Sequence, residues 1–111
     1  MAAPRELRLS KDRRTLSVTL ADGTAAALPA ELLRVESPSA EVQGHDPSQK
    51  VLVTDKGDVT IVRIEPVGRY AVRLVFSDGH ETGIYSWAVL DTFVREGEAM
   101  LTDYRKRTAE L

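Results

Sequence analysis

The fold is decided by the stretch Tyr70–Tyr85, which reads YAVRLVFSDGHETGIY. Apolar side chains recur at every second position from Tyr70 to Phe76, and this period of two predicts a β-strand. Asp78-Gly79 then separates that strand from a second extended run, and Asp-Gly at such a place is the strongest short-range signal for a hairpin. The dipeptide favours a two-residue type I′ turn. The stretch therefore predicts an antiparallel β-hairpin.

The segment Leu16–Leu28 has the same plan, at a constant offset of 56 positions from Asp22 to Asp78. The offset places Leu28 on Ile84 and Thr24 on His80. Each segment is followed by an apolar-periodic stretch typical of a helix. We interpret the two as a pseudo-repeat of a hairpin followed by a helix; the alternative is a coincidence between two generic Asp-Gly hairpins. The helical stretches are 30–36 and 87–96.

Strands are also predicted on either side of these hairpins. A short strand at Leu7–Leu9 opens the chain, and Val59–Glu65 forms another that Pro66 closes. Val51–Val53 is a candidate edge strand. The expected fold class is α+β, with antiparallel hairpins forming a small sheet, a short helix after each hairpin and a helix at the C-terminus.

Helix boundaries follow from capping residues. Ser86 is the expected N-cap of the helix at 87–96 and Gly97 its expected stop. Ser37 followed by Pro38 is the expected start of a short helical turn, which Gly44 ends. We expect a single domain over residues 1–111, with a core at about 7–96 and a helical tail at 97–111.

Composition excludes several classes of protein. The chain has 111 residues, of which 42% are hydrophobic and 29% charged, and its formal net charge is −2. A nucleic-acid binder usually has a basic excess, so no nucleic-acid partner is expected. The absence of cysteine excludes disulfides, thiolate nucleophiles and cysteine-ligated metal clusters. No apolar run approaches the length of a bilayer span, and the N-terminus lacks the apolar run of a signal peptide, so a cytoplasmic domain without membrane contact is expected.

Chemistry-bearing motifs are scarce, and we expect no catalytic residue and no enzyme activity. Only His45 and His80 titrate near neutrality. Because His80 follows an Asp-Gly turn, we expect it to be partly exposed at the sheet rim. It is either a turn residue bonded to Asp78 or to a carbonyl, or a metal ligand or partner contact.

Convergence of the two histidines is a further hypothesis. The long segment Glu36–Gly57 carries His45 and Asp46, and if it folds against the second hairpin these residues meet His80 and Asp78. Such a set of nitrogen and oxygen ligands would suit Zn²⁺ or Fe²⁺.

Two arginines near the central strand are candidates for partner binding. Arg69 and Arg73 are suited to pair with acidic groups of a partner. Exposed arginines on a sheet face are also common as residues that only confer solubility.

Three strings of this sequence resemble one family. They are LLRVESPSAEVQGH (32–45), IEPVGRYAVRL (64–74) and FSDGHETGIYSW (76–87). The chain resembles, over about 7–94, a small bacterial domain of unknown function that is related to the N-terminal domain of gamma-butyrobetaine hydroxylase. The resemblance implies a small α+β fold built on antiparallel sheet.

The resemblance also implies a comparison of metal ligands. In the hydroxylases this domain carries a structural zinc held by three cysteines and one histidine. The cysteine positions fall on Ser37, Ser39 and Val42 of this chain, and the histidine falls on His80. Three of the four ligands are therefore replaced, and we predict that this zinc site is absent. The hydroxylases' catalytic iron/2-oxoglutarate domain has no counterpart here, so an oxygenase activity is not expected.

These observations lead to two functional hypotheses. The first is a non-enzymatic interaction or adaptor module, without cofactor, that presents the His80 turn and the 36–57 segment to a protein partner. The alternative is a metal-binding accessory protein that uses His80 for iron or zinc. A similar domain occurs fused to the Mrp-type P-loop scaffold that handles iron–sulfur clusters, so an iron–sulfur carrier is the expected kind of partner.

Overall fold

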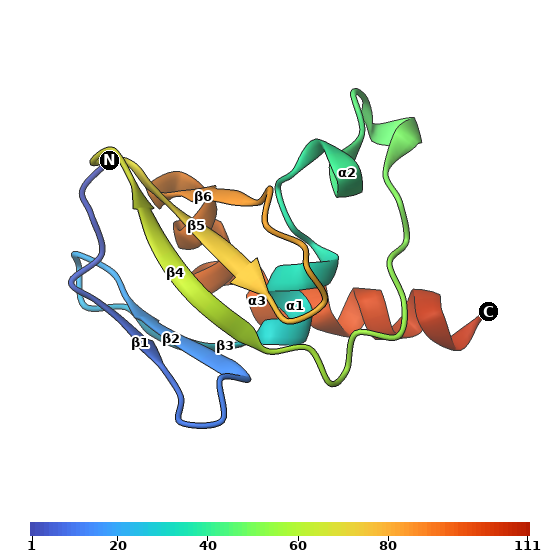
Figure 1. Ribbon diagram of the computed structural model, residues 1–111, viewed down its shortest axis with the longest axis horizontal. Helices are drawn as coiled ribbons and strands as arrows, with labels where there is room; N and C mark the ends of the chain where they lie inside the picture. Colours follow the sequence, from blue (N-terminus) through green and yellow to red (C-terminus); the bar gives the residue numbers. More distant parts are fainter.

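Each half of the chain builds one three-stranded antiparallel sheet followed by a helix (Figure 1). The computed structural model describes all residues, 1–111. The first half contains β1 (Glu6–Leu9), β2 (Thr15–Thr19), β3 (Ala25–Pro29) and α1 (Ala30–Val35). The second contains β4 (Ile61–Val67), β5 (Ala71–Phe76), β6 (Ile84–Ser86) and α3 (Trp87–Ala109), and α2 (Ala40–Gln43) and a 3₁₀ turn, η1 (Pro47–Gln49), lie between the halves. The predicted α+β class is confirmed, with the strands divided between two sheets.

The two Asp-Gly hairpins have the same loop geometry, as the pseudo-repeat predicts. In the first, the Leu20 N–H donates to the Thr24 carbonyl at 2.8 Å and the Gly23 N–H donates to the Leu20 carbonyl at 3.0 Å. In the second, the Phe76 N–H donates to the His80 carbonyl at 2.9 Å and the Gly79 N–H donates to the Phe76 carbonyl at 3.0 Å. Thr24 and His80 therefore occupy equivalent positions.

The predicted type I′ turn is wrong for both hairpins. A type I′ turn needs positive φ at both central residues, whereas only Gly23 and Gly79 have positive φ, each at 90°. The loops are three-residue connections in which a type I turn is followed by a left-handed glycine that forms a bulge. The aspartate explains the choice, because its side chain accepts the N–H two residues on, at 2.9 Å from Thr24 and 3.0 Å from His80.

The halves differ by one residue in register. Leu16 pairs with Leu28 in the first sheet, and the equivalent Val72 pairs with Tyr85 in the second. Tyr85, and not Ile84, is therefore the counterpart of Leu28. Tyr85 is buried in the core, while Ile84 is 47% exposed. The extra residue lies between His80 and Ile84, so the chain directly after His80 is irregular.

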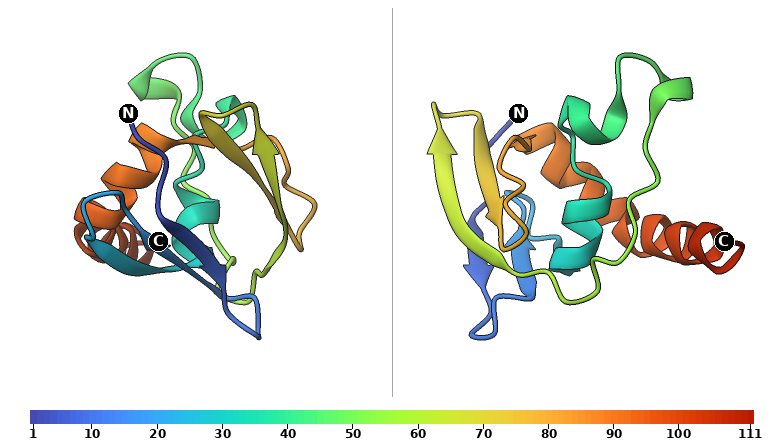
Figure 2. Two further views of the ribbon diagram at one scale, coloured as in Figure 1. Left: turned by 90° about the vertical axis from the view of Figure 1, so that its left-hand side faces the viewer. Right: turned by 45° about the vertical axis from the view of Figure 1, so that its right-hand side comes forward.

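The core draws on both halves. A cluster of fifteen buried residues includes Leu16 and Val18 of β2, Leu74 and Phe76 of β5, and Phe93 of α3, among others. Figure 2 shows α1 lying between the second sheet and α3. Tyr104 is buried as well, so the last helix packs against the body well beyond its first turns.

The predicted helix stop at Gly97 is wrong. α3 runs without a break from Trp87 to Ala109, and Gly97 is buried inside it. A Cβ at this position would lie 3.3 Å from side-chain carbons of both Leu28 and Leu32, so the glycine allows close packing of α3. The predicted cap is confirmed, since the Ser86 hydroxyl accepts the Val89 N–H at 3.2 Å. None of the helices combines the length and apolar character that crossing a bilayer requires.

Three smaller boundaries also differ from the prediction. Pro66 lies inside β4 and pairs with Val72, which is tolerated because β4 is an edge strand. The 51–53 segment forms no strand, and its Val51 N–H donates instead to the Val42 carbonyl at 2.8 Å. The short helix α2 begins at Ala40 and not at Pro38, with Ser39 as its cap residue, while Gly44 ends it as predicted.

Candidate functional site

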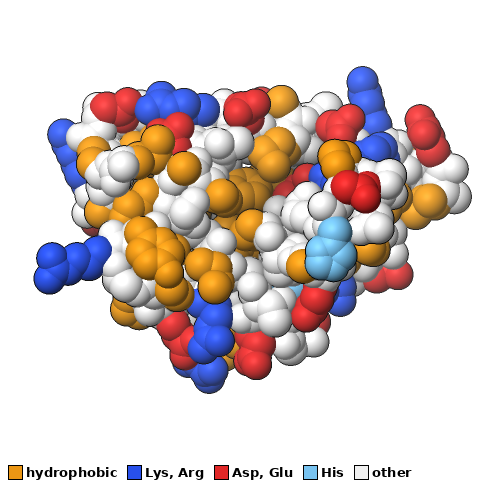
Figure 3. All heavy atoms as spheres, turned by 90° about the horizontal axis from the view of Figure 1, so that it is seen from above, with side chains coloured by type: hydrophobic (Ala, Val, Ile, Leu, Met, Phe, Trp, Pro, Cys, Tyr) orange, Lys and Arg blue, Asp and Glu red, His pale blue; other side chains and the backbone are white.

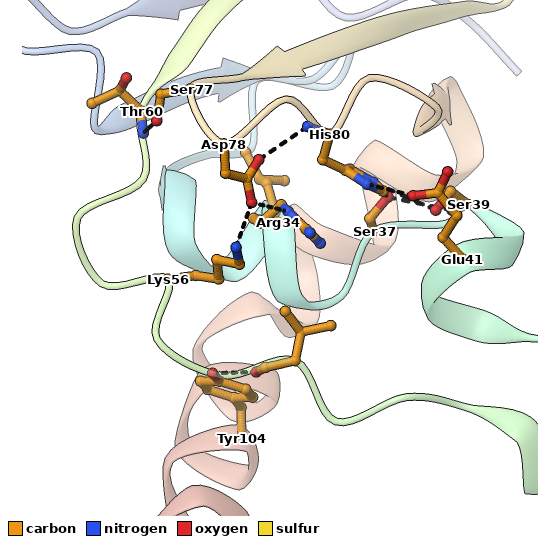
Figure 4. A network of polar contacts seen from close by, with 12 residues as sticks. Arg34, Ser37, Ser39, Glu41, Lys56, Thr60, Ser77, Asp78, His80 and Tyr104 are labelled. Carbon is orange, nitrogen blue, oxygen red and sulfur yellow. Dashed lines mark hydrogen bonds and ion pairs between the residues drawn. The ribbon is translucent and has the colours of Figure 1, made fainter.

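His80 is buried, although its place after a turn predicted partial exposure. The residue is only 6% exposed. The irregular backbone that follows it and the segment leading into α2 together enclose the imidazole (Figure 4). The hairpin turn thus directs His80 inward, against residues that lie about forty positions earlier in the chain.

Both ring nitrogens of His80 have partners. Nε2 lies 2.9 Å from the Ser37 hydroxyl and 3.4 Å from the Ser39 hydroxyl, and Nδ1 lies 3.1 Å from Oε2 of Glu41. A carboxylate accepts hydrogen bonds only, so the proton of a neutral ring belongs on Nδ1. Nε2 then accepts a hydrogen bond from the Ser37 hydroxyl. We call Ser37, Ser39, Glu41 and His80 the histidine cluster.

The histidine of this cluster is held in its neutral form. Burial lowers the pKa of His80, and the nearby Arg34 cation lowers it further. Glu41 and Asp78 act in the opposite direction without offsetting these effects. A neutral imidazole is what the hydrogen bond from Ser37 to Nε2 requires.

Asp78 ties the turn itself to the first half of the chain. Its Oδ2 accepts from Arg34 Nε and from Lys56 Nζ, each at 2.8 Å, and its Oδ1 accepts the His80 N–H at 3.0 Å. Burial alone would raise the pKa of Asp78, but the hydrogen bonds from Lys56, from the His80 N–H and from Arg34 hold it well below its usual value. The carboxylate is therefore a charged anchor and not a proton donor.

Close packing completes the enclosure of Ser37. A Cβ on Gly83 would lie 2.6 Å from the Ser37 hydroxyl oxygen and 3.0 Å from a ring carbon of Tyr85. The Tyr85 hydroxyl donates to the Leu33 carbonyl, which holds β6 against the end of α1. Burial raises the pKa of Tyr85, so this hydroxyl keeps its proton.

The histidine cluster has the connectivity of a nucleophile, a base and an orienting carboxylate, but its surroundings do not suit catalysis. A hydroxyl bonded to Nε2 of a histidine whose Nδ1 meets a carboxylate is the arrangement of a serine triad. Ser37, however, has 0% of its surface exposed. It is also absent from the linings of the hollows along α3 and beside the N-terminus. The cluster therefore offers a substrate no access to its hydroxyl.

The residues around His80 do not fit a zinc ion. Ser37 and Ser39 both lie beside His80, which is where the hydroxylase resemblance places the family's ligands. Structural zinc is bound by thiolate, imidazole or carboxylate groups, whereas these two donors are neutral hydroxyls, and buried Val42 has no donor. No group of three His, Asp or Glu side chains in the structure could hold a metal ion.

The predicted convergence of His45 and Asp46 on His80 does not occur. His45 is exposed, and its backbone N–H donates to the Gln49 side chain at 2.9 Å. Asp46 accepts the Ser48 N–H at 2.9 Å and caps η1. Both residues serve the local geometry of the 36–57 segment.

The two arginines singled out near the central strand lie outside this cluster. Arg73 Nε donates to Glu65 at 2.9 Å across the β4–β5 pair. Arg69 is exposed and makes no ion pair, and its carbonyl accepts the Trp87 indole N–H at 2.8 Å. A role of either residue in partner binding stays a prediction.

Sequence reasoning missed three members of this region, namely Glu41, Arg34 and Lys56. No local pattern marks them, because each meets its partner across the fold. One indication of the region as a whole came from the sequence, which was the family resemblance that placed Ser37 and Ser39 at ligand positions together with His80.

Comparisons with known proteins agree with this fold. The family model described as gamma-butyrobetaine hydroxylase-like, N-terminal, matches residues 7–91. A crystal structure of a DUF971-family protein of unknown function from Acidithiobacillus ferrooxidans is 42% identical, with a TM-score of 0.67 over 82% of this chain and 91% of that one.

Two solution structures determined by NMR are similar over nearly the whole chain. One is 40% identical, with a TM-score of 0.83 over 98% of this chain and 86% of its own. The other is 44% identical, with a TM-score of 0.80 over 100% of this chain and 84% of its own. No curated protein matches this chain.

Proposed function

This chain belongs to the family of gamma-butyrobetaine hydroxylase-like N-terminal domains, and from that premise and its geometry we propose a cytoplasmic, non-enzymatic interaction module. The observation that carries the proposal is the histidine cluster. Its only histidine is buried, has both ring nitrogens hydrogen-bonded and faces no open hollow. These properties suit a structural brace, meaning a set of contacts that fixes one segment against another, and not a reactive centre. What the brace positions is the 36–57 segment.

That segment is held to the body at several points besides His80. Arg107 of α3 donates to Glu36 at 3.5 Å, and the Tyr104 hydroxyl of the same helix donates to the Val53 carbonyl at 2.6 Å. Between these anchors the residues from His45 to Val51 are exposed. An exposed loop held in one conformation binds a partner at a lower entropic cost than a mobile loop does. Function in small domains is commonly carried by such loops.

The face that carries this segment has an apolar hollow. Figure 3 looks onto it and shows apolar side chains in a recess among charged ones. A cavity of about 320 Å³ lies between the segment and α3, with Pro38, Val89, Phe93 and Met100 among its lining residues. In the proposal, this recess receives an apolar side chain of a protein partner, and the iron–sulfur carriers are the class of partner to test.

A photo-crosslinking amino acid at Ser48 tests the proposal, with the same amino acid at Arg8 on β1 as the matched control. We expect a discrete protein adduct from the Ser48 position in cells and none from Arg8. The purified partner should then bind in calorimetry and lose at least tenfold in affinity to Met100→Asp. Adducts at both positions, or no binding by the purified partner, would contradict the module.

The alternative of a metal-binding accessory protein is distinguished by elemental analysis of the untagged protein. In that alternative a metal on Nε2 of His80 would have to replace the hydrogen bond from the Ser37 hydroxyl at 2.9 Å. Near-stoichiometric zinc or iron that is lost in His80→Ala and kept in His45→Ala would establish that alternative over the interaction module.

A further inference from the structure

The ring of His80 is arranged like that of a metal-bound histidine, although the other ligands are missing. A histidine that ligates a metal through one nitrogen almost always donates its second N–H to a carboxylate, a carbonyl or a water. Glu41 meets Nδ1 of His80 in this way at 3.1 Å. The Nε2 lone pair is thereby directed at the Ser37 and Ser39 hydroxyls (Figure 4).

The distances from Nε2 of His80 to the two hydroxyl oxygens are close to the distance between two atoms that ligate the same metal ion. In a tetrahedral zinc site, the bond lengths of zinc to nitrogen and to sulfur place the two ligand atoms about 3.5 Å apart. The hydroxyl oxygens lie 2.9 and 3.4 Å from Nε2. The Ser37 oxygen lies closer than that because it is directly hydrogen-bonded to Nε2, while the Ser39 oxygen lies at about the metal-site distance.

We infer that the histidine cluster is a metal-free replacement for a metal centre. Ser37, Ser39, Glu41 and His80 join the segment before α2 to the β5–β6 turn by hydrogen bonds. A metal bound to His80 and to thiolates at positions 37, 39 and 42 would make the same link. This inference rests on the same histidine cluster as the proposed interaction function, but its test reads out metal binding and not partner binding.

Two features adapt the site to its metal-free state. Gly83 gives Ser37 the room to approach the ring, since any Cβ there would come within 2.6 Å of the hydroxyl oxygen. The Ser37 hydroxyl donates one hydrogen bond, to Nε2 of His80, and accepts another from the Ser39 N–H at 3.3 Å. The link therefore needs no ion to satisfy its polar atoms.

The test compares the full-length wild-type chain with the triple variant Ser37→Cys/Ser39→Cys/Val42→Cys, both kept reduced. Zinc content after dialysis and the melting temperature with and without EDTA are the readouts. We expect no stoichiometric metal in the wild type and no effect of EDTA on its melting temperature. The triple variant should bind one zinc per chain and melt at a lower temperature in EDTA, and adding His80→Ala should abolish its zinc binding.

A cobalt titration of Ser37→Cys/Ser39→Cys covers the case in which the triple variant fails to fold. We expect its absorption spectrum to show thiolate-to-cobalt charge transfer, while the matched control Ser48→Cys/Ser77→Cys, at two exposed serines, shows none. Chelator-sensitive melting of the wild type would overturn the inference, as would a folded cysteine variant that binds neither zinc nor cobalt.

Discussion

His80 behaves as a core residue whose two ring nitrogens are both hydrogen-bonded in the neutral state. Its Nε2 accepts from Ser37 and its Nδ1–H donates to Glu41, so the neutral ring has both partners it needs. The charged groups around it are Glu41 from α2, Arg34 from α1 and Asp78 from its own turn. Lys56 forms an ion pair with Asp78. Burial and Arg34 dominate, and they lower the pKa of His80.

This pKa makes the stability of the fold depend on pH in a defined window. The unfolded chain has a histidine pKa of about 6.5, and the folded chain has a lower one. Below pH 6.5 the unfolded state therefore binds more protons, and the free energy of unfolding falls as the pH falls. The slope from this one group stays below about 1.4 kcal/mol per pH unit and levels off below the folded pKa. Urea denaturation between pH 5 and 8 measures it.

Two glutamine variants assign this slope to the correct histidine. His80→Gln should remove the dependence between pH 5 and 6.5, whereas His45→Gln, at an exposed site, should keep it. The loss of the Asp78 ion pairs is separate, because the stability from a lowered carboxylate pKa is lost only below about pH 5. Equal slopes for His80→Gln and the wild type would show that another group titrates.

Gly83 predicts a second effect at the scale of one residue. Gly83→Ala would place a methyl group 2.6 Å from the Ser37 hydroxyl oxygen, so the cluster must move apart. We expect a loss of about 1–3 kcal/mol in the free energy of unfolding. Gly57→Ala is the matched control, since its Cβ would meet only a Glu31 oxygen at 3.9 Å. If both variants unfold at the same urea concentration, the contact at Ser37 is not tight.

At the scale of elements, the most consequential contact is that of α3 with the first half of the chain. Gly97 lets the helix approach Leu28 of β3 and Leu32 of α1, and a Cβ would lie 3.3 Å from each. Gly97→Leu overfills this contact and should lower the free energy of unfolding by about 1–3 kcal/mol. Ala99→Leu, on the exposed side of the same helix, should change it by less than about 0.5 kcal/mol. A Gly97→Leu protein as stable as the wild type would mean that α3 is loosely packed.

Gly97 also shows why element boundaries were harder to predict than elements. Alternating apolar side chains and Asp-Gly turns mark the strands, so both hairpins could be located from the sequence. A glycine after a helical stretch is the usual sign of a helix end, and nothing local distinguishes that from a glycine required by a neighbouring leucine. The one-residue shift in register that puts Tyr85 in the core could not be predicted either, because aligning the two hairpins at a constant offset of 56 positions matches Leu28 with Ile84.

The whole molecule explains why the candidate site was only partly predictable. Ser37 and His80 are 43 positions apart and meet because the 36–57 segment folds back over the second hairpin. The sequence identified His80 and, through the family resemblance, its two serines. Glu41 and Arg34 enter only through the packing of α2 and α1, which no spacing along the chain specifies.

The pseudo-repeat raises the question of whether its halves unfold independently. Each half has its own sheet, but the fifteen-residue core joins β2 of the first to β5 of the second and to α3. A half in isolation would expose the apolar inner face of its sheet to water, and a three-stranded sheet of this size would not be stable without that burial. We therefore expect a single cooperative transition for the whole chain.

Leu16→Ala tests this cooperativity. Leu16 is fully buried in β2, so the truncation should cost about 2–5 kcal/mol. If the halves unfold together, native-state hydrogen exchange will show the same loss of opening free energy for the slowest amides of β5 as for those of β2. The exposed change Thr92→Ala on α3 is the control, with a small effect everywhere. Losses confined to β1, β2, β3 and α1 would mean that the two sheets are separate folding units, which the shared core argues against.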